Sequence, residues 1–241
     1  MIYGDGDGKY FQRFTTCIDV IGHELTHGVS QYAAGLGHSG QTGALGEHFS
    51  DVFGILVKQY SRKETAAKSD WIIGEGLFTS RVHGDGIRSM KAPGSAYDDP
   101  VIGRDPQVAN MHDYVKTSAD ERGVHLNCGI PNHAFYQIAM LLGGRAWETA
   151  GHIWYRALTT GIGPRTTFQQ CADATWRAAG QLYGAGSAPQ EAVFAGWKAV
   201  GIDVSAAVLD RGPRLPILDS TPHSHEEFDL PDAGAEVPML G

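Results

Sequence analysis

The sequence predicts a mainly α-helical domain with a small β element or hairpin near its N-terminus. Three observations lead to this prediction. Apolar residues recur at helical spacing over residues 18–32 and again over residues 43–53. From residue 131 onward, the chain consists of helical patterns that are separated by glycine-containing breaks. The first eight residues, MIYGDGDG, are instead rich in Gly and Asp, which is typical of a hairpin or a tight loop.

The length and composition of the chain limit the functions that it can have. With 241 residues, of which 42% are hydrophobic, we expect one or two domains with a sizeable core. The net charge of −8 argues against nucleic acid or an anionic membrane as the main partner. No stretch approaches the roughly 18 consecutive apolar residues of a membrane span. The N-terminal residues also lack the pattern of a secretory signal peptide.

The first helical pattern contains the motif His-Glu-x-x-His. His23 and His27 lie one helical turn apart on the same face, and two neutral imidazoles so placed can reach one small cation. Glu24 lies about 100° around the helix from His23, close enough to hold a water on that cation without binding the cation itself. This is the arrangement that a water-activating zinc site needs. The alternative is a helix with two merely exposed histidines.

The second helical pattern supplies a third metal ligand. Glu47 and Asp51 are four residues apart, so they share one face of a helix. Glu47 can complete a site of two histidines and a glutamate, and Asp51 can accept the free ring N–H of a ligand histidine. The alternative is a solvated carboxylate face, but the apolar residues on either side favour burial of at least part of it.

The rest of the chain divides into an irregular segment, a helical segment and a tail. Residues 61–129 are poor in helical periodicity, and long irregular segments of this kind are often functional. Residues 205–241 are acidic and rich in proline, so we expect a tail after a domain of residues 1–204. Between them, helices are predicted at Asn132–Leu142, Ala146–Thr160, Thr166–Tyr183 and Pro189–Val200.

Taken together, these motifs resemble the thermolysin family of zinc metalloendopeptidases. The resemblance implies the helical C-terminal domain of that family and zinc-dependent hydrolysis of internal peptide bonds in proteins or peptides. It also implies a preference for apolar residues on the amine side of the cleaved bond, and secretion. The matching segments are Met1–Gly8, His23–His27, Gly43–Gly54, Gly84–Met90 and Gly123–Asn127, with the similarity ending near Gly201.

The resemblance also implies roles for individual residues. The zinc ligands would be His23, His27 and Glu47, with Glu24 as the general base and Asp51 as the partner of His23. A second set of residues would act on the substrate itself. His125, oriented by Asp120, would stabilise the tetrahedral intermediate, and Arg88 would hold a substrate carbonyl. An apolar substrate pocket would be lined by Phe11, Phe14, Val20, Ile73, Leu77 and Ile87.

The sequence departs from the family pattern at two places. His38 stands where the family has a tyrosine that assists with the oxyanion, and a histidine donates from a shorter side chain. The β-rich N-terminal domain of the family, with its substrate-binding edge strand, would precede Met1 and is not in this chain. The native protein could therefore have an N-terminal domain or propeptide that this sequence does not include.

The resemblance also bears on calcium. In the family, a paired-calcium site behind the zinc helices is built from five acidic side chains. Two calcium ions need extensive sharing of carboxylates. At the five matching positions of this chain only three carboxylates remain, those of Asp19, Asp70 and Glu75. We therefore expect no paired-calcium site, and we expect Lys58 to form an ion pair with at least one of the three. A single calcium near Thr79–Asp85 is left open. The matching positions are Asp19, Lys58, Asp70, Ile72 and Glu75.

Two other functions remain open at this point. A chain with this zinc site but without the N-terminal domain could bind zinc and be weakly active or non-proteolytic. The helical patterns could also belong to an interaction protein that binds no metal. Cleavage of casein, with Glu24→Ala as the control, distinguishes an active enzyme from the first alternative. Elemental analysis for zinc distinguishes it from the second.

Overall fold

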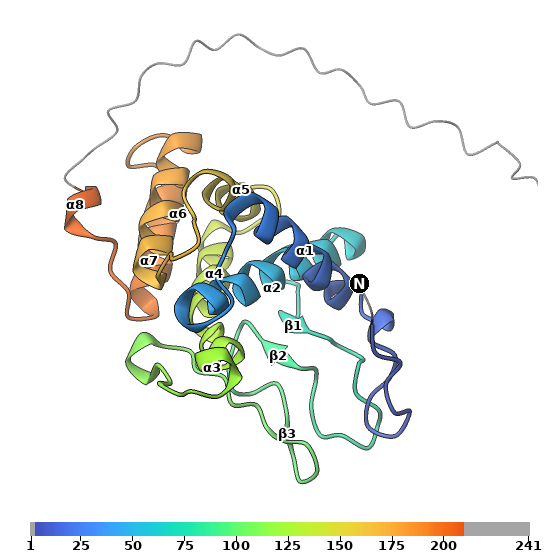
Figure 1. The fold of residues 1–241 in the computed structure, drawn as a ribbon. Helices are drawn as coiled ribbons and strands as arrows, with labels where there is room; N and C mark the ends of the chain where they lie inside the picture. Colours follow the sequence, from blue (N-terminus) through green and yellow to red (C-terminus); the bar gives the residue numbers. More distant parts are fainter. Residues whose placement is uncertain (1–2, 210–241) are drawn as a thin grey trace, which may run out of the picture.

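The structure, a computed structural model, describes residues 3–209 of the chain, and residues 210–241 of the predicted tail lie outside the described residues. The predicted mainly α-helical fold is confirmed (Figure 1). The α-helices are α1 (Ile18–Ala34), α2 (Gly40–Arg62), α3 (Asp120–Asn127), α4 (Gly129–Leu142), α5 (Ala150–Thr160), α6 (Phe168–Tyr183), α7 (Ala188–Ala199) and α8 (Ala206–Leu209), and the 3₁₀ helices are η1 (Phe14–Thr16) and η2 (Met111–Asp113).

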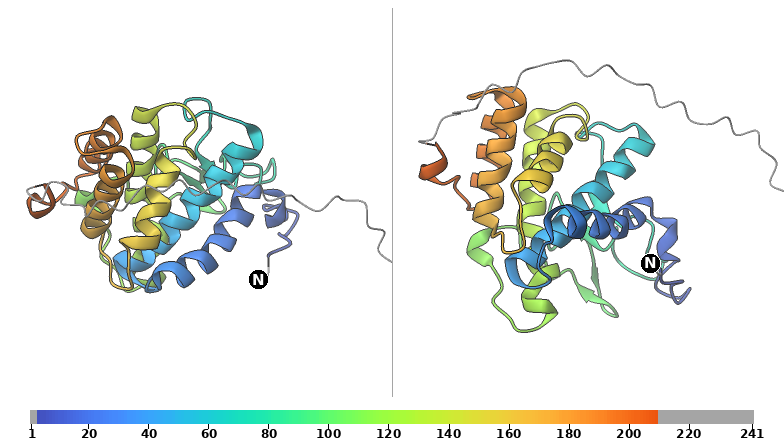
Figure 2. Two further views of the ribbon diagram at one scale, coloured as in Figure 1. Left: turned by 90° about the horizontal axis from the view of Figure 1, so that it is seen from above. Right: turned by 45° about the horizontal axis from the view of Figure 1, so that its top comes forward.

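Helices α1 and α2 lie side by side and carry the residues of the predicted metal site (Figures 1 and 2). Glycines at the contact allow the two backbones to approach closely. A Cβ atom on Gly22 would lie 3.1 Å from the Cα of Gly54, and a Cβ on Gly54 would lie 2.5 Å from the carbonyl oxygen of Asp19. Helix α1 ends at Gly35, whose left-handed φ of 59° lets its N–H bond to the carbonyl of Gln31.

Helices α4 to α7 form a group beside α2 and enclose the main hydrophobic core (Figure 2). Trp154 of α5 and Trp197 of α7 are fully buried and stack in parallel, with ring centroids 6.3 Å apart. Helix α6 begins with a capping box of Thr167 and Gln170, which satisfies two backbone donors at its first turn. This core holds α2, and thereby Glu47 and Asp51, in a fixed position.

The strands are short and lie in the segment that the sequence analysis describes as irregular. Strand β1 (Ile72–Ile73) pairs antiparallel with β2 (Arg88–Ser89), and β3 (Asp98–Asp99) pairs antiparallel with β4 (Gly103–Arg104). Near the N-terminus, the β structure is an isolated antiparallel bridge between Phe11 and Phe78. The pairing of β1 with β2 places Arg88 opposite Ile73, next to the buried face of α2.

Some element boundaries differ from the sequence-based expectation. Helix α4 begins at Gly129 rather than Asn132, because Pro131 is tolerated in the first turn of a helix, where its missing N–H has no partner to lose. Helix α3 lies within the segment that was expected to be irregular, and its first four residues, from Asp120 to Gly123, have left-handed φ angles of 51°, 45°, 67° and 78°. Among residues 3–209, none of the helices has the length and apolar character needed to cross a membrane.

Candidate metal centre

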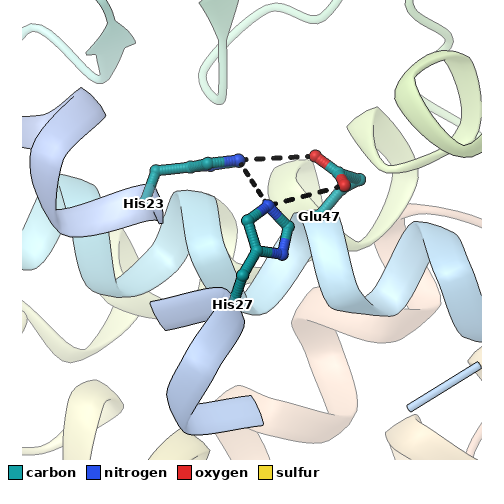
Figure 3. Close-up of side chains that lie close together, drawn as sticks. All are labelled: His23, His27 and Glu47. Atoms are coloured by element: carbon teal, nitrogen blue, oxygen red, sulfur yellow. Dashed lines mark hydrogen bonds and ion pairs between the residues drawn. The ribbon is translucent and has the colours of Figure 1, made fainter. Parts of the chain in front are cut away.

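Three side chains from α1 and α2 bring their donor atoms to one point (Figure 3). The Nε2 atoms of His23 and His27 are 3.0 Å apart. Oxygen atoms of Glu47 lie 3.4 Å from Nε2 of His23 and 3.7 Å from Nε2 of His27. Two histidines and one glutamate, with one histidine side chain 38% exposed, form a donor set that fits a zinc ion with an open coordination position.

His23 is oriented by a fully buried carboxylate. Its Nδ1 lies 2.8 Å from Oδ1 of Asp51, which is 0% exposed. Arg88 donates from Nε and Nη2 to the two oxygens of Asp51 at 2.8 and 2.6 Å. Burial opposes ionisation of Asp51, but the charge of Arg88 and the hydrogen bond from His23 hold its pKa well below the usual range. Asp51 is therefore an ionised acceptor, and the alternative of a solvated carboxylate face is wrong.

Glu24 lies on α1 between the two histidines and is half-buried. Within residues 3–209 its side chain makes no hydrogen bond and no ion pair. Its carboxylate is therefore available to a water or a substrate at the metal site. This is the condition that a general base must meet in the enzyme without substrate.

His125 approaches the same three residues from α3. Its Nε2 lies 3.3 Å from Oε2 of Glu47, its Nδ1 lies 2.6 Å from Oδ1 of Asp120, and its backbone N–H donates to Oδ2 of Asp120 at 2.8 Å. The hydrogen bond with Glu47 raises the pKa of His125 to about 9, against the opposing effect of burial. The left-handed start of α3 makes this possible, because it turns the carboxylate of Asp120 back towards a residue five positions later.

A cavity of about 300 Å³ lies beside His125. Two of the six expected pocket residues, Phe11 and Ile87, line it. Val20 and Leu77 are buried in a small apolar cluster against which Phe11, Phe14 and Ile87 pack. Ile73 is fully buried in the main core instead. Arg88, which was expected to hold a substrate carbonyl, also lines the cavity. The other lining residues, which the sequence analysis did not identify, are Phe78, Tyr97, Ile102, Asp105, Pro106 and Gln107.

His38 lies at a second cavity of the site. It is exposed and lines a cavity of about 470 Å³ together with the metal-site residues His27 and Glu47. The structure therefore brings His38 to the same site as the predicted metal ligands. His125 lines the other cavity, so the two histidines face the site from different cavities.

Behind the metal site, Lys58 is almost fully buried among three carboxylates. Its Nζ lies 2.9 Å from Asp70, 3.2 Å from Glu75 and 3.9 Å from Asp19. It also donates to the carbonyl oxygen of Ile72 at 2.9 Å. The ion pair that was expected for Lys58 is confirmed.

One buried network near the site could not be identified from the sequence. His48, which the sequence analysis assigned no role, is fully buried, and this burial lowers its pKa to about 4. Its ring lies between Trp154 and Asn132, and Asn132 donates to Oδ2 of Asp51 at 2.9 Å. The only signal in the sequence is the position of His48 directly after Glu47 in an apolar helical pattern.

Comparison with known proteins agrees with this geometry. Residues 34–202 match the alpha-helical domain of thermolysin metallopeptidases, and residues 1–31 match their catalytic domain. An extracellular metalloprotease of Pectobacterium carotovorum subsp. carotovorum is 48% identical over 210 residues, which are 87% of this chain and 60% of that protein. The protease PrtS of Photorhabdus sp. is 48% identical over 207 residues, 85% of this chain and 55% of that protein.

A solved structure shows the same fold. The precursor of protealysin, a metalloproteinase from Serratia proteamaculans, superimposes with a TM-score of 0.82 and 52% sequence identity, covering 84% of this chain and 62% of that one. The present chain thus spans 55% to 60% of the length of the two relatives named above. Its sequence and its fold together show that it belongs to the thermolysin family of metallopeptidases.

Proposed function

We propose that the chain is a zinc-dependent endopeptidase and that residues 1–204 form its catalytic domain. The observation that carries the proposal is the convergence of donor atoms from His23, His27 and Glu47 within 4.8 Å of one another. A bound zinc ion would supply Lewis-acid activation of a water molecule and of the peptide carbonyl. The unpartnered carboxylate of Glu24 beside these ligands supports hydrolysis rather than a purely structural site.

The protein groups then have distinct tasks. Glu24 takes a proton from the attacking water and passes it to the leaving amine. His125, held by Asp120, donates a hydrogen bond to the oxygen of the tetrahedral intermediate, and His38 is placed to assist from the second cavity. Arg88 uses Nε and Nη2 for Asp51, so its Nη1, which has no acceptor among the described residues, can bind a substrate carbonyl.

The cavity beside His125 supports a preference for apolar side chains on the amine side of the cleaved bond. Its walls include Phe11, Phe78 and Ile87, and Val20 and Leu77 pack behind them. Burying an apolar side chain in such a cavity stabilises a complex by roughly 1.5–3 kcal/mol. The cavity volume of about 300 Å³ suits a single side chain of the size of leucine or phenylalanine.

A second candidate function is a zinc-binding chain whose own proteolytic activity is weak. It is favoured by the outer face of α1, where large apolar side chains stay exposed. Exposed apolar patches of this kind are typical of surfaces that contact another domain or protein. The occupant could be an N-terminal domain or a propeptide. The exposed residues are Ile18 at 42%, Leu25 at 56%, Val29 at 49% and Tyr32 at 95%.

Two further properties belong to the proposal. Because related proteases are named extracellular, we propose that this protein is secreted. Because the ammonium of Lys58 lies among Asp19, Asp70 and Glu75, we also propose that the paired-calcium site is absent. A positive charge at that point repels a calcium ion and uses the oxygens that would bind it.

The proposed function is tested with the purified chain. We expect one zinc per chain and cleavage of casein. Glu47→Gln should lose most of the metal, whereas Glu24→Gln should keep the metal and lose activity by orders of magnitude. Equal loss of metal in both variants would contradict the ligand assignment.

The same measurements separate the two candidates. Zinc binding with slow cleavage supports the second candidate function, a zinc-binding chain of weak activity. Adding a family-like upstream domain should then raise kcat/KM about tenfold or more, because the substrate is better positioned. A kcat/KM near 10⁵ M⁻¹ s⁻¹ for the chain alone, which is roughly an ordinary enzyme value, would exclude it.

A further inference from the structure

A chain of buried hydrogen bonds runs from α5 to the metal site. Its first member is the indole of Trp154, whose Nε1 lies 2.7 Å from Nε2 of His48. An indole N–H can only donate a hydrogen bond. Nε2 of His48 must therefore accept it, and the ring proton of the neutral histidine must be on Nδ1.

The direction of each following bond is then determined. Nδ1 of His48 lies 2.8 Å from Oδ1 of Asn132, so His48 donates to the amide oxygen. The amide nitrogen of Asn132 is left facing Asp51 and donates to Oδ2 at 2.9 Å. The other oxygen of Asp51 accepts from Nδ1 of His23 at 2.8 Å. In the neutral ring that a metal ion requires, the lone pair of His23 is therefore on Nε2, which faces His27 and Glu47.

We propose that Trp154, His48 and Asn132 are positioning residues for the metal site, because together with Arg88 they hold Asp51 in the orientation in which it accepts the hydrogen bond from His23. This inference rests on the proposed zinc site. None of the three residues lies within reach of the metal or the substrate, and each acts through the next. The relay connects α5, α2 and α4 to α1 (Figure 1).

The reverse arrangement of the relay is strongly disfavoured. If the proton of His48 moved to Nε2, it would meet the indole N–H of Trp154. Asn132 would then have to turn its NH₂ group towards His48 and its oxygen towards the carboxylate of Asp51, which would place two acceptors in contact. All four groups are at most 1% exposed, so no solvent can replace the lost bonds. One indole N–H thus selects one of two hydrogen-bond patterns.

The test compares two tryptophans that stack on each other. Trp154→Phe removes the N–H that starts the relay. Trp197→Phe is the matched control, because Trp197 is equally buried and its Nε1 donates to Oγ1 of Thr175 at 2.8 Å, outside the relay. For both variants of the full chain, the dissociation constant of zinc is measured by competition with a chromophoric chelator. The visible spectrum of the Co²⁺-loaded protein reports the ligand geometry.

We expect Trp154→Phe to weaken zinc binding about threefold to tenfold and to change the Co²⁺ spectrum. Loss of a residue that hydrogen-bonds directly to a metal ligand lowers metal affinity about 10–100-fold. Residues further along the hydrogen-bond relay should have a smaller effect. Trp197→Phe should lower thermal stability while leaving zinc affinity and the spectrum unchanged. Equal zinc affinity in Trp154→Phe and the wild type, or an equal loss in both variants, would overturn the proposal.

A second variant and a metal-free measurement complete the test. Asn132→Leu keeps the approximate size of the side chain but has no N–H to donate to Asp51, so it should weaken zinc binding more than Trp154→Phe does. ¹⁵N NMR of histidine-labelled, metal-free protein should show His48 with its proton on Nδ1 at pH 7, and a mixture of tautomers in Trp154→Phe. A proton on Nε2 in the wild type would overturn the relay. Absence of zinc binding by the wild type would instead refute the proposed function.

Discussion

Nζ of Lys58 lies 2.9 Å from a carboxylate oxygen of Asp70, and only 2% of the lysine side chain is exposed. The same ammonium contacts Glu75 and the backbone of Ile72, so it links α2 to the segment around β1. Its distance of 3.9 Å from Asp19 extends the link to α1. The two helices that carry the proposed metal ligands thus share one buried cation.

Removal of this cation should destabilise the fold. Lys58→Met leaves the buried carboxylate of Asp19 without its counter-charge, and breaking a buried ion pair costs about 3 kcal/mol or more. Urea unfolding should show this decrease in the free energy of unfolding. Lys68→Met, at an exposed position on the following loop, is the control and should stay within about 0.5 kcal/mol of the wild type. Equal stability of Lys58→Met and wild type would show that the cluster is not stabilising.

A change of the charge at this position should create a calcium site. Lys58→Glu would place a fourth carboxylate beside Asp19, Asp70 and Glu75, close to the carbonyl of Ile72, and calcium binds such oxygen sets. We expect added calcium to raise the melting temperature of Lys58→Glu more than that of the wild type. A ligand at 100 times its Kd stabilises by about 2.7 kcal/mol. Calcium bound elsewhere would raise the melting temperatures of Lys58→Glu and the wild type equally, and this result would contradict the prediction.

The acid stability of the protein should depend on Glu75. Burial raises the pKa of Glu75, but the ion pairs with Arg62 and Lys58 outweigh it and lower the pKa to about 2. A carboxyl group whose pKa is lowered in the folded state stabilises the fold at any pH above its pKa in the unfolded chain. This contribution is lost as the pH falls towards 2.

Glu75→Gln should therefore be less stable than the wild type at pH 7, and the difference should shrink between about pH 4.5 and pH 2. Thermal unfolding across this pH range measures it. Glu148→Gln alters an exposed contact with Arg145 and serves as the control, with a pH curve like that of the wild type. A constant difference between Glu75→Gln and wild type at every pH would contradict the prediction.

The orientation of His125 should matter for the rate but not for metal binding. Asp120→Ala removes both hydrogen bonds to His125, at 2.6 and 2.8 Å. We expect kcat to fall about tenfold, less than the roughly 100-fold or greater loss when an oxyanion donor is itself removed. The zinc content should not change. Asp113→Ala breaks a similar but exposed pair with His112 and should leave kcat unchanged, so a loss of the same size in both variants would refute the role.

Two isoleucines of the predicted pocket should behave differently. Ile87 lines the cavity beside His125, whereas Ile73 is fully buried in the main core. Ile87→Ala should enlarge the cavity and change the ratio of kcat/KM for substrates with Phe and Leu after the cleaved bond by about tenfold. Ile73→Ala should lower stability by about 2–5 kcal/mol and leave this ratio unchanged. If both variants changed the ratio equally, Ile73 would belong to the pocket after all.

Local patterns were sufficient to predict α1, α2 and α4 to α7, and the spacing of the motif residues. His23 and His27 are four residues apart on one helix, so their approach to a common point follows from helix geometry alone. Glu47 and Asp51 follow in the same way on α2, and the apolar residues around them indicated burial. The contact between the two helices depends on glycine at positions that periodicity does not single out.

Contacts between distant segments could not be predicted from local patterns. Trp154 meets His48 across 106 positions in the chain, and Asn132 meets His48 across 84. The left-handed start of α3 was also not predictable, because three of its four residues, Asp120, Glu121 and Arg122, are not glycine. Such angles persist only when the surrounding structure imposes them. The cavity residues Phe78 and Tyr97 belong to the same irregular segment, where sequence periodicity carries no information.

The backbone contact at Gly54 sets the spacing of the metal ligands without touching a metal. Two ligands come from α1 and one from α2, and a Cβ on Gly54 would lie 2.5 Å from Asp19 and 3.2 Å from the backbone nitrogen of His23. A methyl group there would move α1 away from α2 and widen the gap between the histidines and Glu47. The separation of the two helices at Gly54 thus determines the size of ion that the proposed site can hold, although Gly54 is not one of the proposed ligands.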